Sequence, residues 1–122
     1  MSDVPRLHPG VITDAASATL EHVPVEPDQV VAGAPTTGYL ELDDDGTRSV
    51  GVWEMSVGAM RDVEVDEVFV VLAGAATVEF EHPVADPIIL APGSVVRLTA
   101  GMRTIWTVRQ TLRKIYVTPP VE

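Results

Sequence analysis

A cluster of acids stands directly ahead of an apolar run in the stretch RDVEVDEVFVVLA (61–73). Asp62, Glu64, Asp66 and Glu67 are spaced closely enough to bind a hard cation or to act as general acid and base. Charges at a strand end also occur simply to keep that end soluble. On one regular strand the first three acids would share a face, opposite Glu67. Their spacing alone therefore leaves both a cation site and a solvated strand end open.

Glu67 differs from the other acids because it begins the apolar segment. Its same-side neighbours are Phe69, Val71 and Ala73, so we expect its carboxylate to point into the interior. A carboxylate taken out of water needs a partner or a proton. Arg61 is the candidate partner. The pair would either be structural or bind an anionic or carbonyl-bearing ligand, with Glu67 as general acid or base.

Two tryptophans stand out in a chain in which only 5% of the residues are aromatic. Trp106 follows Thr104 by two residues, so their side chains share one face of a strand. Trp53 lies on an earlier strand. On the last strand we expect Tyr116, rather than Lys114, to face inward. These residues either pack in the core or form walls that stack on a planar ligand.

Composition and charge exclude several classes of function. The chain has 122 residues, enough for one domain with one core, and its formal net charge is −10. Such a charge repels phosphate backbones and anionic lipids, so neither a nucleic acid nor a membrane is expected as partner. The absence of cysteine excludes thiolate metal sites and cysteine nucleophiles. With no signal-peptide pattern in the first twenty residues, we expect a soluble cytoplasmic protein.

Two regions differ in their patterning. Residues 1–36 are rich in proline and predict an irregular N-terminal arm, whereas residues 37–122 show short β-type runs separated by turn residues. Short strands without intervening helices predict an antiparallel sandwich or barrel. We expect strands near 38–42, 48–56, 67–73, 76–81, 87–90, 94–98, 104–109 and 112–118.

Two separated blocks resemble those of the cupins. The first is Glu67 with Gly74 in EVFVVLAG, and the second is PGSVVRLTAGMRTIW, with Gly93 and Gly101. The segments VGVWEMSVG (50–58) and WTVRQTLRKIYV are similar to small cupins of the (S)-ureidoglycine aminohydrolase and ethanolamine-utilisation protein Q type. The resemblance implies an all-β, single-domain cupin: a small jelly-roll β-barrel over 37–122 that carries the arm.

The same resemblance bears on metal binding. Metal-binding cupins carry histidines at positions that here fall on Arg61, Val63 and Thr104, so a three-histidine metal centre is excluded. The resemblance also places a turn between Val63 and Glu67, which favours a solvated corner for the other acids. It assigns the face shared by Thr104 and Trp106 to the barrel interior.

We therefore expect a metal-independent cupin whose pocket binds or transforms a small polar or anionic metabolite. The expected catalytic pair is Glu67 and Arg61, and the expected substrate-binding residues are Trp53, Thr104, Trp106 and Tyr116. One alternative is a metalloenzyme with unusual ligands, in which the arm brings His8 or His22 to Glu67. The other is a non-catalytic binding or assembly module. Because 67–73 is apolar on both faces, we also expect a homodimer.

Overall fold

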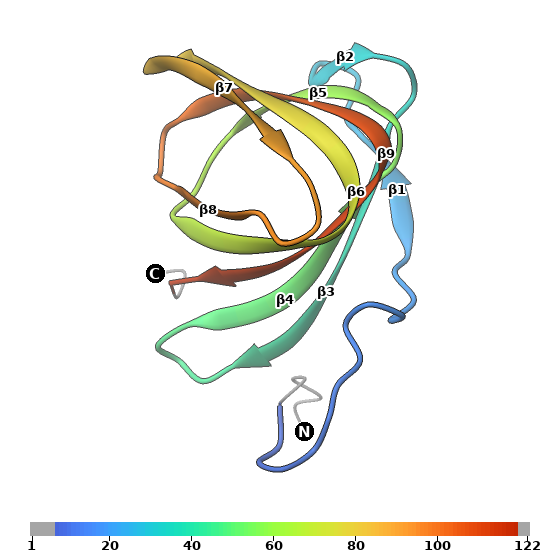
Figure 1. Cartoon of the computed structure of the whole chain (residues 1–122), viewed down its shortest axis with the longest axis vertical. Coiled ribbons are helices and arrows are strands. Elements are labelled where there is room, and N and C mark those ends of the chain that lie inside the picture. The colour runs from blue at the N-terminus through green and yellow to red at the C-terminus, as the bar shows by residue number, and fades with distance from the viewer. Residues whose placement is uncertain (1–6, 120–122) are drawn as a thin grey trace.

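The chain folds as a curled all-β barrel. A computed structural model describes residues 7–119, and within them every regular element is a strand (Figure 1). No helix in this part of the chain is long and apolar enough to cross a membrane. The strands are β1 (His22–Pro24), β2 (Val30–Ala32), β3 (Thr36–Asp44), β4 (Ser49–Met55), β5 (Gly58–Val63), β6 (Glu67–His82), β7 (Val84–Leu90), β8 (Val95–Leu98) and β9 (Arg103–Thr118). The all-β architecture predicted from the sequence is confirmed.

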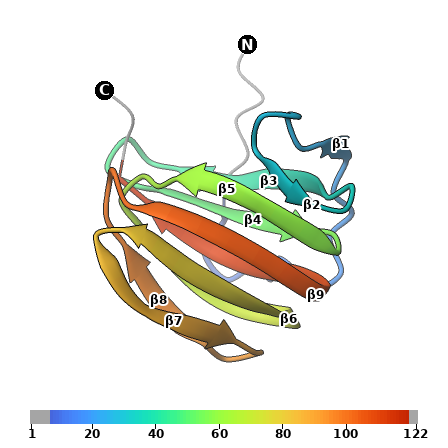
Figure 2. The same ribbon diagram turned by 90° about the horizontal axis from the view of Figure 1, so that it is seen from above.

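The long strands β6 and β9 form the centre of the sheet. They run antiparallel along nearly their whole lengths, from Val68 opposite Val117 to His82 opposite Arg103. β9 also pairs with β4 and β5, and β6 pairs with β7 and β8. Figure 2 shows β5, β9 and β6 side by side, with β7 and β8 folded beneath them. The sheet thus curls on itself, and its inner face forms the core.

Two expected strand breaks are absent. The predicted strands 67–73 and 76–81 are one strand, β6, and the predicted strands 104–109 and 112–118 are one strand, β9. Gly74 does not end β6 but marks an irregular stretch in its pairing with β9, between Ala73 and Ala76. It has φ +97°, and a Cβ there would collide with the carbonyl oxygen of Thr111, so only glycine fits.

Three strands were not predicted. β1 and β2 lie in the expected arm and pair with β3 and β5, so the part of residues 1–36 that the structure describes is partly built into the sheet. These strands are three residues long and lack a readable alternation. β5 was also missed, because its acidic end resembled a turn. Residues 1–6 of the predicted arm and 120–122 of the predicted barrel lie outside the described residues.

The core fills the interior between the strands β4 to β9. Its largest fully buried side chains include Trp106, Phe69, Met55, Leu90 and Leu98. Along β9, every second residue from Thr104 to Val108 and from Leu112 to Lys114 is buried. The same face continues through Tyr116 and Thr118 toward the open end, where core packing gives way to a pocket.

Candidate functional site

A cavity of about 230 Å³ opens between β3, β4, β5 and the paired strands β6 and β9. Its lining is both aromatic and charged, and consists of Tyr39, Trp53, Asp62, Glu64, Glu67, Trp106, Lys114, Tyr116 and Thr118. Pockets that bind small molecules combine apolar walls with a few placed polar groups in this way.

Glu64 is the most buried acid of the pocket, with 6% of its surface exposed. Its Oε2 accepts hydrogen bonds from Thr104 Oγ1 at 2.5 Å and from Trp106 Nε1 at 3.0 Å. Among residues 7–119, no hydrogen bond is made to Oε1, yet no fully enclosed side-chain nitrogen or oxygen lacks a partner. Oε1 must therefore be open to the cavity, where a ligand or water can reach it.

Lys114 and Glu67 form an ion pair in the pocket wall. Lys114 Nζ lies 2.6 Å from Glu67 Oε2, and the two side chains are only 5% and 10% exposed. The same Nζ lies 4.3 Å from the ring centre of Phe69 and 4.7 Å from those of Trp53 and Trp106. Aromatic faces stabilise a cation that has lost much of its water. Lys114 is therefore stabilised both by the opposite charge of Glu67 and by three aromatic rings.

Asp62 is the acid whose proton equilibrium is shifted toward neutral pH. Burial, followed by the nearby charge of Glu64, raises its pKa to about 6. Both effects disfavour the ionised form. The backbone N–H of Val63 donates a hydrogen bond to its Oδ1 at 2.9 Å and opposes them in part. Asp62 can thus take up or release a proton near physiological pH, as a general acid or base must.

Tyr116 lies at the mouth of the pocket, where its ring fits over a glycine. A Cβ at Gly51, its partner across β4 and β9, would collide with the ring of Tyr116. Burial and then the charge of Glu41 raise the pKa of Tyr116 to about 12, so its hydroxyl keeps its proton. Tyr116 and Thr118 also line a second hollow of about 440 Å³ beside the pocket, together with Glu41 and Asp44.

Comparison with protein families assigns this architecture. The model of the EutQ-like cupin domain matches residues 42–116, which is more than half of the chain. The chain belongs to the EutQ-like cupin family. This confirms the resemblance found in the sequence, and the barrel is a cupin jelly roll. A comparison with curated proteins finds no match.

Solved cupin structures share the fold at low sequence identity. The EutQ protein of Clostridium difficile superposes with a TM-score of 0.61 at 19% identity, over 70% of this chain and 69% of that one. A putative ethanolamine utilization protein Q from Salmonella typhimurium gives 0.61 at 17% identity, over 85% and 98%. A protein of unknown function from Pseudomonas syringae gives 0.69 at 21% identity, over 83% of this chain and 44% of that one. These similarities support the fold alone.

The cupin pocket contains most of the residues expected from the sequence. Glu67, Trp53, Trp106 and Tyr116 line it, and Thr104 lies behind it as a hydrogen-bond donor to Glu64. Trp53 and Trp106 lie against each other, with ring centres 5.6 Å apart. The positions agree with the prediction that these side chains face the interior, while their roles toward a ligand stay predictions.

Arg61 is a correction. Its side chain points to the outer face of β5, is 54% exposed and lies 3.5 Å from Glu81. The expected pair between Arg61 and Glu67 does not form, and Lys114 takes the place of Arg61. The prediction assigned the wrong set of alternate residues to the inner face of β5. Met60 and Asp62 face inward on this strand, and Arg61 faces outward.

Five residues that line the pocket were not predicted as site residues: Tyr39, Asp62, Glu64, Lys114 and Thr118. Asp62 and Glu64 were interpreted as part of a solvated corner, which describes only Asp66; the latter accepts a hydrogen bond from the Ala100 N–H at the surface. Lys114 was placed opposite Tyr116, although residues two apart share a face of a regular strand. The signal that could have found the acids is the period of two through Met60, Asp62 and Glu64.

The histidines lie away from the cupin pocket. His22 was considered as a metal ligand with Glu67, but its ring hydrogen-bonds Thr36 and Glu54, each at 2.7 Å, on the outside of the barrel. His8 is exposed. Over residues 7–119, no three histidine or acidic side chains are arranged to hold a metal ion. The geometry thus gives no support to the metal site on Glu67 and an arm histidine.

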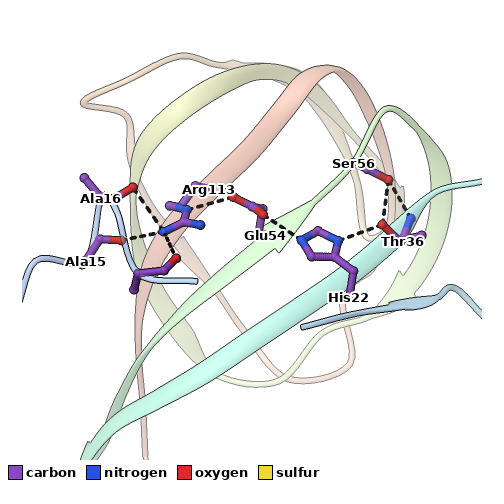
Figure 3. Close-up of polar contacts among 8 residues, drawn as sticks. Ala15, Ala16, His22, Thr36, Glu54, Ser56 and Arg113 are labelled. Atoms are coloured by element: carbon purple, nitrogen blue, oxygen red, sulfur yellow. Dashed lines mark hydrogen bonds and ion pairs between the residues drawn. The ribbon is translucent and has the colours of Figure 1, made fainter. Parts of the chain in front are cut away.

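A polar network fastens the arm behind the pocket wall (Figure 3). Arg113 donates hydrogen bonds to the carbonyl oxygens of Ala15, Ala16 and Ala18, and its Nε lies 2.8 Å from Glu54 Oε2. Burial alone would raise the pKa of Glu54, but its contacts with Arg113 and His22 outweigh this and lower the pKa. Glu54 and Arg113 are opposite each other in the register and directly adjacent to the pocket pair Trp53 and Lys114.

Proposed function

We propose that this cupin binds a small polar metabolite in its barrel pocket without a histidine-bound metal. The observation that carries the proposal is the open Oε1 of Glu64, a residue with only 6% of its surface exposed, whose other carboxylate oxygen is fixed by Thr104 and Trp106. Burying a carboxylate is costly unless its oxygens are satisfied. An oriented acceptor facing a cavity is a feature of a binding site rather than of a packed core.

Proton transfer is the chemistry that this pocket supports best. Asp62, with its pKa raised to about 6, adjoins Glu64 and can exchange a proton with a bound ligand. Glu67 is less suited to this role than the sequence suggested, because Lys114 holds one of its oxygens at 2.6 Å. We therefore assign acid–base chemistry to Asp62 and a positioning role to the pair of Glu67 and Lys114.

The alternative of a non-catalytic assembly module predicts a barrel filled by its own side chains. Trp53 and Trp106 pack together at one wall, yet a cavity of about 230 Å³ remains beside them. The cavity favours a ligand-binding pocket.

A ligand screen by thermal shift tests the proposal, since a compound that binds only the native state raises the melting temperature. Compounds of up to roughly ten non-hydrogen atoms match the cavity, because an engineered cavity of about 150 Å³ already admits benzene. Each stabilising compound is repeated on Glu64→Gln and on the control Glu81→Gln, which removes an acid from the outer surface. We expect stabilisation to weaken in Glu64→Gln alone; equal stabilisation in all three proteins contradicts the proposal.

We also propose that the cupin forms a homodimer through the outer face of β6, β8 and β9. Val68 and Val70 alternate with the inward-facing residues Glu67, Phe69 and Val71 of β6 and are 39% and 36% exposed. Val95 stands opposite Val70, and Val117 opposite Val68, so the four side chains lie next to one another in an apolar patch that Arg97, also opposite Val68, borders. Patches of this kind mark interfaces between proteins.

A further inference from the structure

We infer that the ligand of this pocket is a small organic cation that carries an ammonium group with N–H donors. The inference rests on the binding function proposed above and deepens it. The sequence alone suggested an anionic ligand, because Arg61 was expected inside the barrel. With Arg61 on the outer face, the charge of the pocket is reversed.

Acids outnumber bases in the lining of the cavity. Asp62, Glu64 and Glu67 are opposed by Lys114 alone among the lining residues, which gives a formal charge of −3 + 1 = −2 when all are ionised. Lys114 is already committed to Glu67 at 2.6 Å. The charge left without an opposite partner is therefore that of Glu64 and Asp62. An anionic ligand would add to this repulsion, whereas a cation would relieve it.

The hydrogen-bonding positions that stay free on Glu64 and Asp62 are acceptors. Glu64 Oε1 is open to the cavity, and the protein hydrogen bond to Asp62, from the Val63 N–H, reaches only Oδ1. The donors of Thr104 and Trp106 are already directed at Glu64 Oε2. An ionised carboxylate can only accept hydrogen bonds, so the matching ligand group must donate them. An ammonium group donates several and makes them charge-assisted.

The walls and the approach favour the same charge. Tyr39, Trp53 and Tyr116 line the cavity, and aromatic faces attract cations. The hollow that adjoins the mouth contains Glu41 and Asp44, and the whole chain has a net charge of −10. A field of one sign around a cleft concentrates ligands of the opposite sign.

The geometry points to an organic cation rather than a metal ion. In the part of the chain that the structure describes, the acids of the pocket do not form a group of three that could hold a metal. The cavity of about 230 Å³ is also far larger than an ion requires. An ammonium on a compact apolar body would place its charge at Glu64 and Asp62 and its body against the aromatic walls.

Three probes of nearly the same shape test the sign of the charge: benzylammonium, benzyl alcohol and benzoate. Binding to the whole chain is followed through the two tryptophan indole N–H signals in nitrogen-15 NMR spectra. Trp106 Nε1–H donates to Glu64, and Trp53 packs against Trp106 in the pocket lining, so both signals report on the pocket. We expect benzylammonium to bind at least about tenfold more tightly than benzyl alcohol, and benzoate more weakly than either.

Variants locate the effect. Glu64→Gln and, separately, the partly exposed Asp62→Asn should each weaken benzylammonium binding by about tenfold, because each loses one charge-assisted contact. Glu81→Gln, which removes the same charge from the outer face, should leave binding unchanged.

Benzoate binding as tightly as benzylammonium, or equal losses in all three variants, would overturn the inference. If the uncharged or anionic probe binds without a preference for the cation, the inference about the ligand charge is wrong, but the proposal that the pocket binds a ligand still stands. If none of the three probes nor any screened metabolite shifts an indole signal, the binding function fails as well.

Discussion

Lys114 Nζ lies 2.6 Å from Glu67 Oε2, inside a ring of three aromatic side chains. The pair joins the neighbouring strands β9 and β6 on their inner face. The lysine of the pocket is therefore neutralised by Glu67 and is not free to attract an anion. The charge balance of the site follows from this contact, because Asp62 on β5 and Glu64 in the turn after it form no ion pair with a basic side chain of residues 7–119.

Replacing one member of this ion pair should destabilise the fold more than replacing both members. We expect Glu67→Gln to lower the free energy of unfolding by about 3 kcal/mol, because Lys114 is left buried without its counter-charge. Glu67→Gln combined with Lys114→Met should recover part of the loss. Urea unfolding of both variants measures this, and a double variant no more stable than Glu67→Gln would refute the account.

Stability should fall as pH rises through the range set by Asp62. Its pKa is about 6 in the folded chain and 3.8 in its ordinary state, so the folded form binds the proton more tightly. The free energy of unfolding therefore decreases between about pH 4 and pH 6 through this group. Asp62→Asn should be about 1–2 kcal/mol more stable than the unmodified chain at pH 7, relative to their difference at pH 4.

Urea unfolding at both pH values checks this prediction. Other acids, such as Glu54, have lowered pKa values and change stability in the opposite direction. Only the difference between the two proteins isolates Asp62. A difference that is the same at pH 4 and pH 7 contradicts the expectation.

The arm should detach when its anchor is removed. Arg113→Met deletes the hydrogen bonds to Ala15, Ala16 and Ala18 together with the Glu54 contact, and we expect a loss of about 2–4 kcal/mol. Hydrogen exchange and proteolysis should both accelerate around residues 14–20. Arg109→Met is the matched control, because Arg109 on the same strand hydrogen-bonds Thr77 at an exposed position. Equal effects of the two substitutions would show that Arg113 does not anchor the arm.

The glycine beneath Tyr116 should be irreplaceable while the tyrosine is present. Gly51→Ala inserts a methyl group where the ring lies, and we expect a loss of about 1–3 kcal/mol. Combining Gly51→Ala with Tyr116→Ala removes the collision, so the methyl group should then cost much less. A double-mutant cycle on the free energy of unfolding gives the coupling. Additive effects would mean that the two positions do not meet.

The proposed dimer makes a prediction about size in solution. Val70→Lys places a charge in the apolar patch of the outer face and should shift the chain from dimer to monomer in light scattering. Val84→Lys is the control, since Val84 is 86% exposed on β7 and lies outside that patch. A monomer before any substitution excludes the dimer.

Much of the fold could be predicted from the sequence because its signals are local. Glycines in the two cupin blocks and the short apolar runs indicated the barrel, and Gly74, Gly93 and Gly101 all have positive φ. The merged strands were unpredictable for a physical reason. Whether Gly74 ends a strand or only distorts it depends on Thr111, far along the chain, rather than on its sequence neighbours.

The site was harder to predict because its residues depend on which alternate positions of each strand face inward. Counting from Glu67 assigned Arg61 to the interior, whereas the pairing of Met60 with Trp106 fixes Asp62 inside. An offset of one residue along β5 placed the cation Arg61 inside the barrel instead of the anion Asp62. This reversed the charge that was inferred for the ligand. Glu64 was missed since acids before a strand are usually solvated. Its burial depends on Thr104 and Trp106, forty residues away.

The alternation of inward and outward side chains in the two halves of β9, on either side of the exposed residues 109–111, constrains how this pocket can evolve. Trp106, Lys114 and Tyr116 lie on its inner face, and Arg113 fastens the arm on its outer face. An insertion or deletion of one residue before Lys114 would turn the lysine outward and the arginine inward, and both sites would be lost together. Descendants of this sequence can therefore acquire new specificities by exchanging side chains on β9, while changes of length are confined to the loops around it.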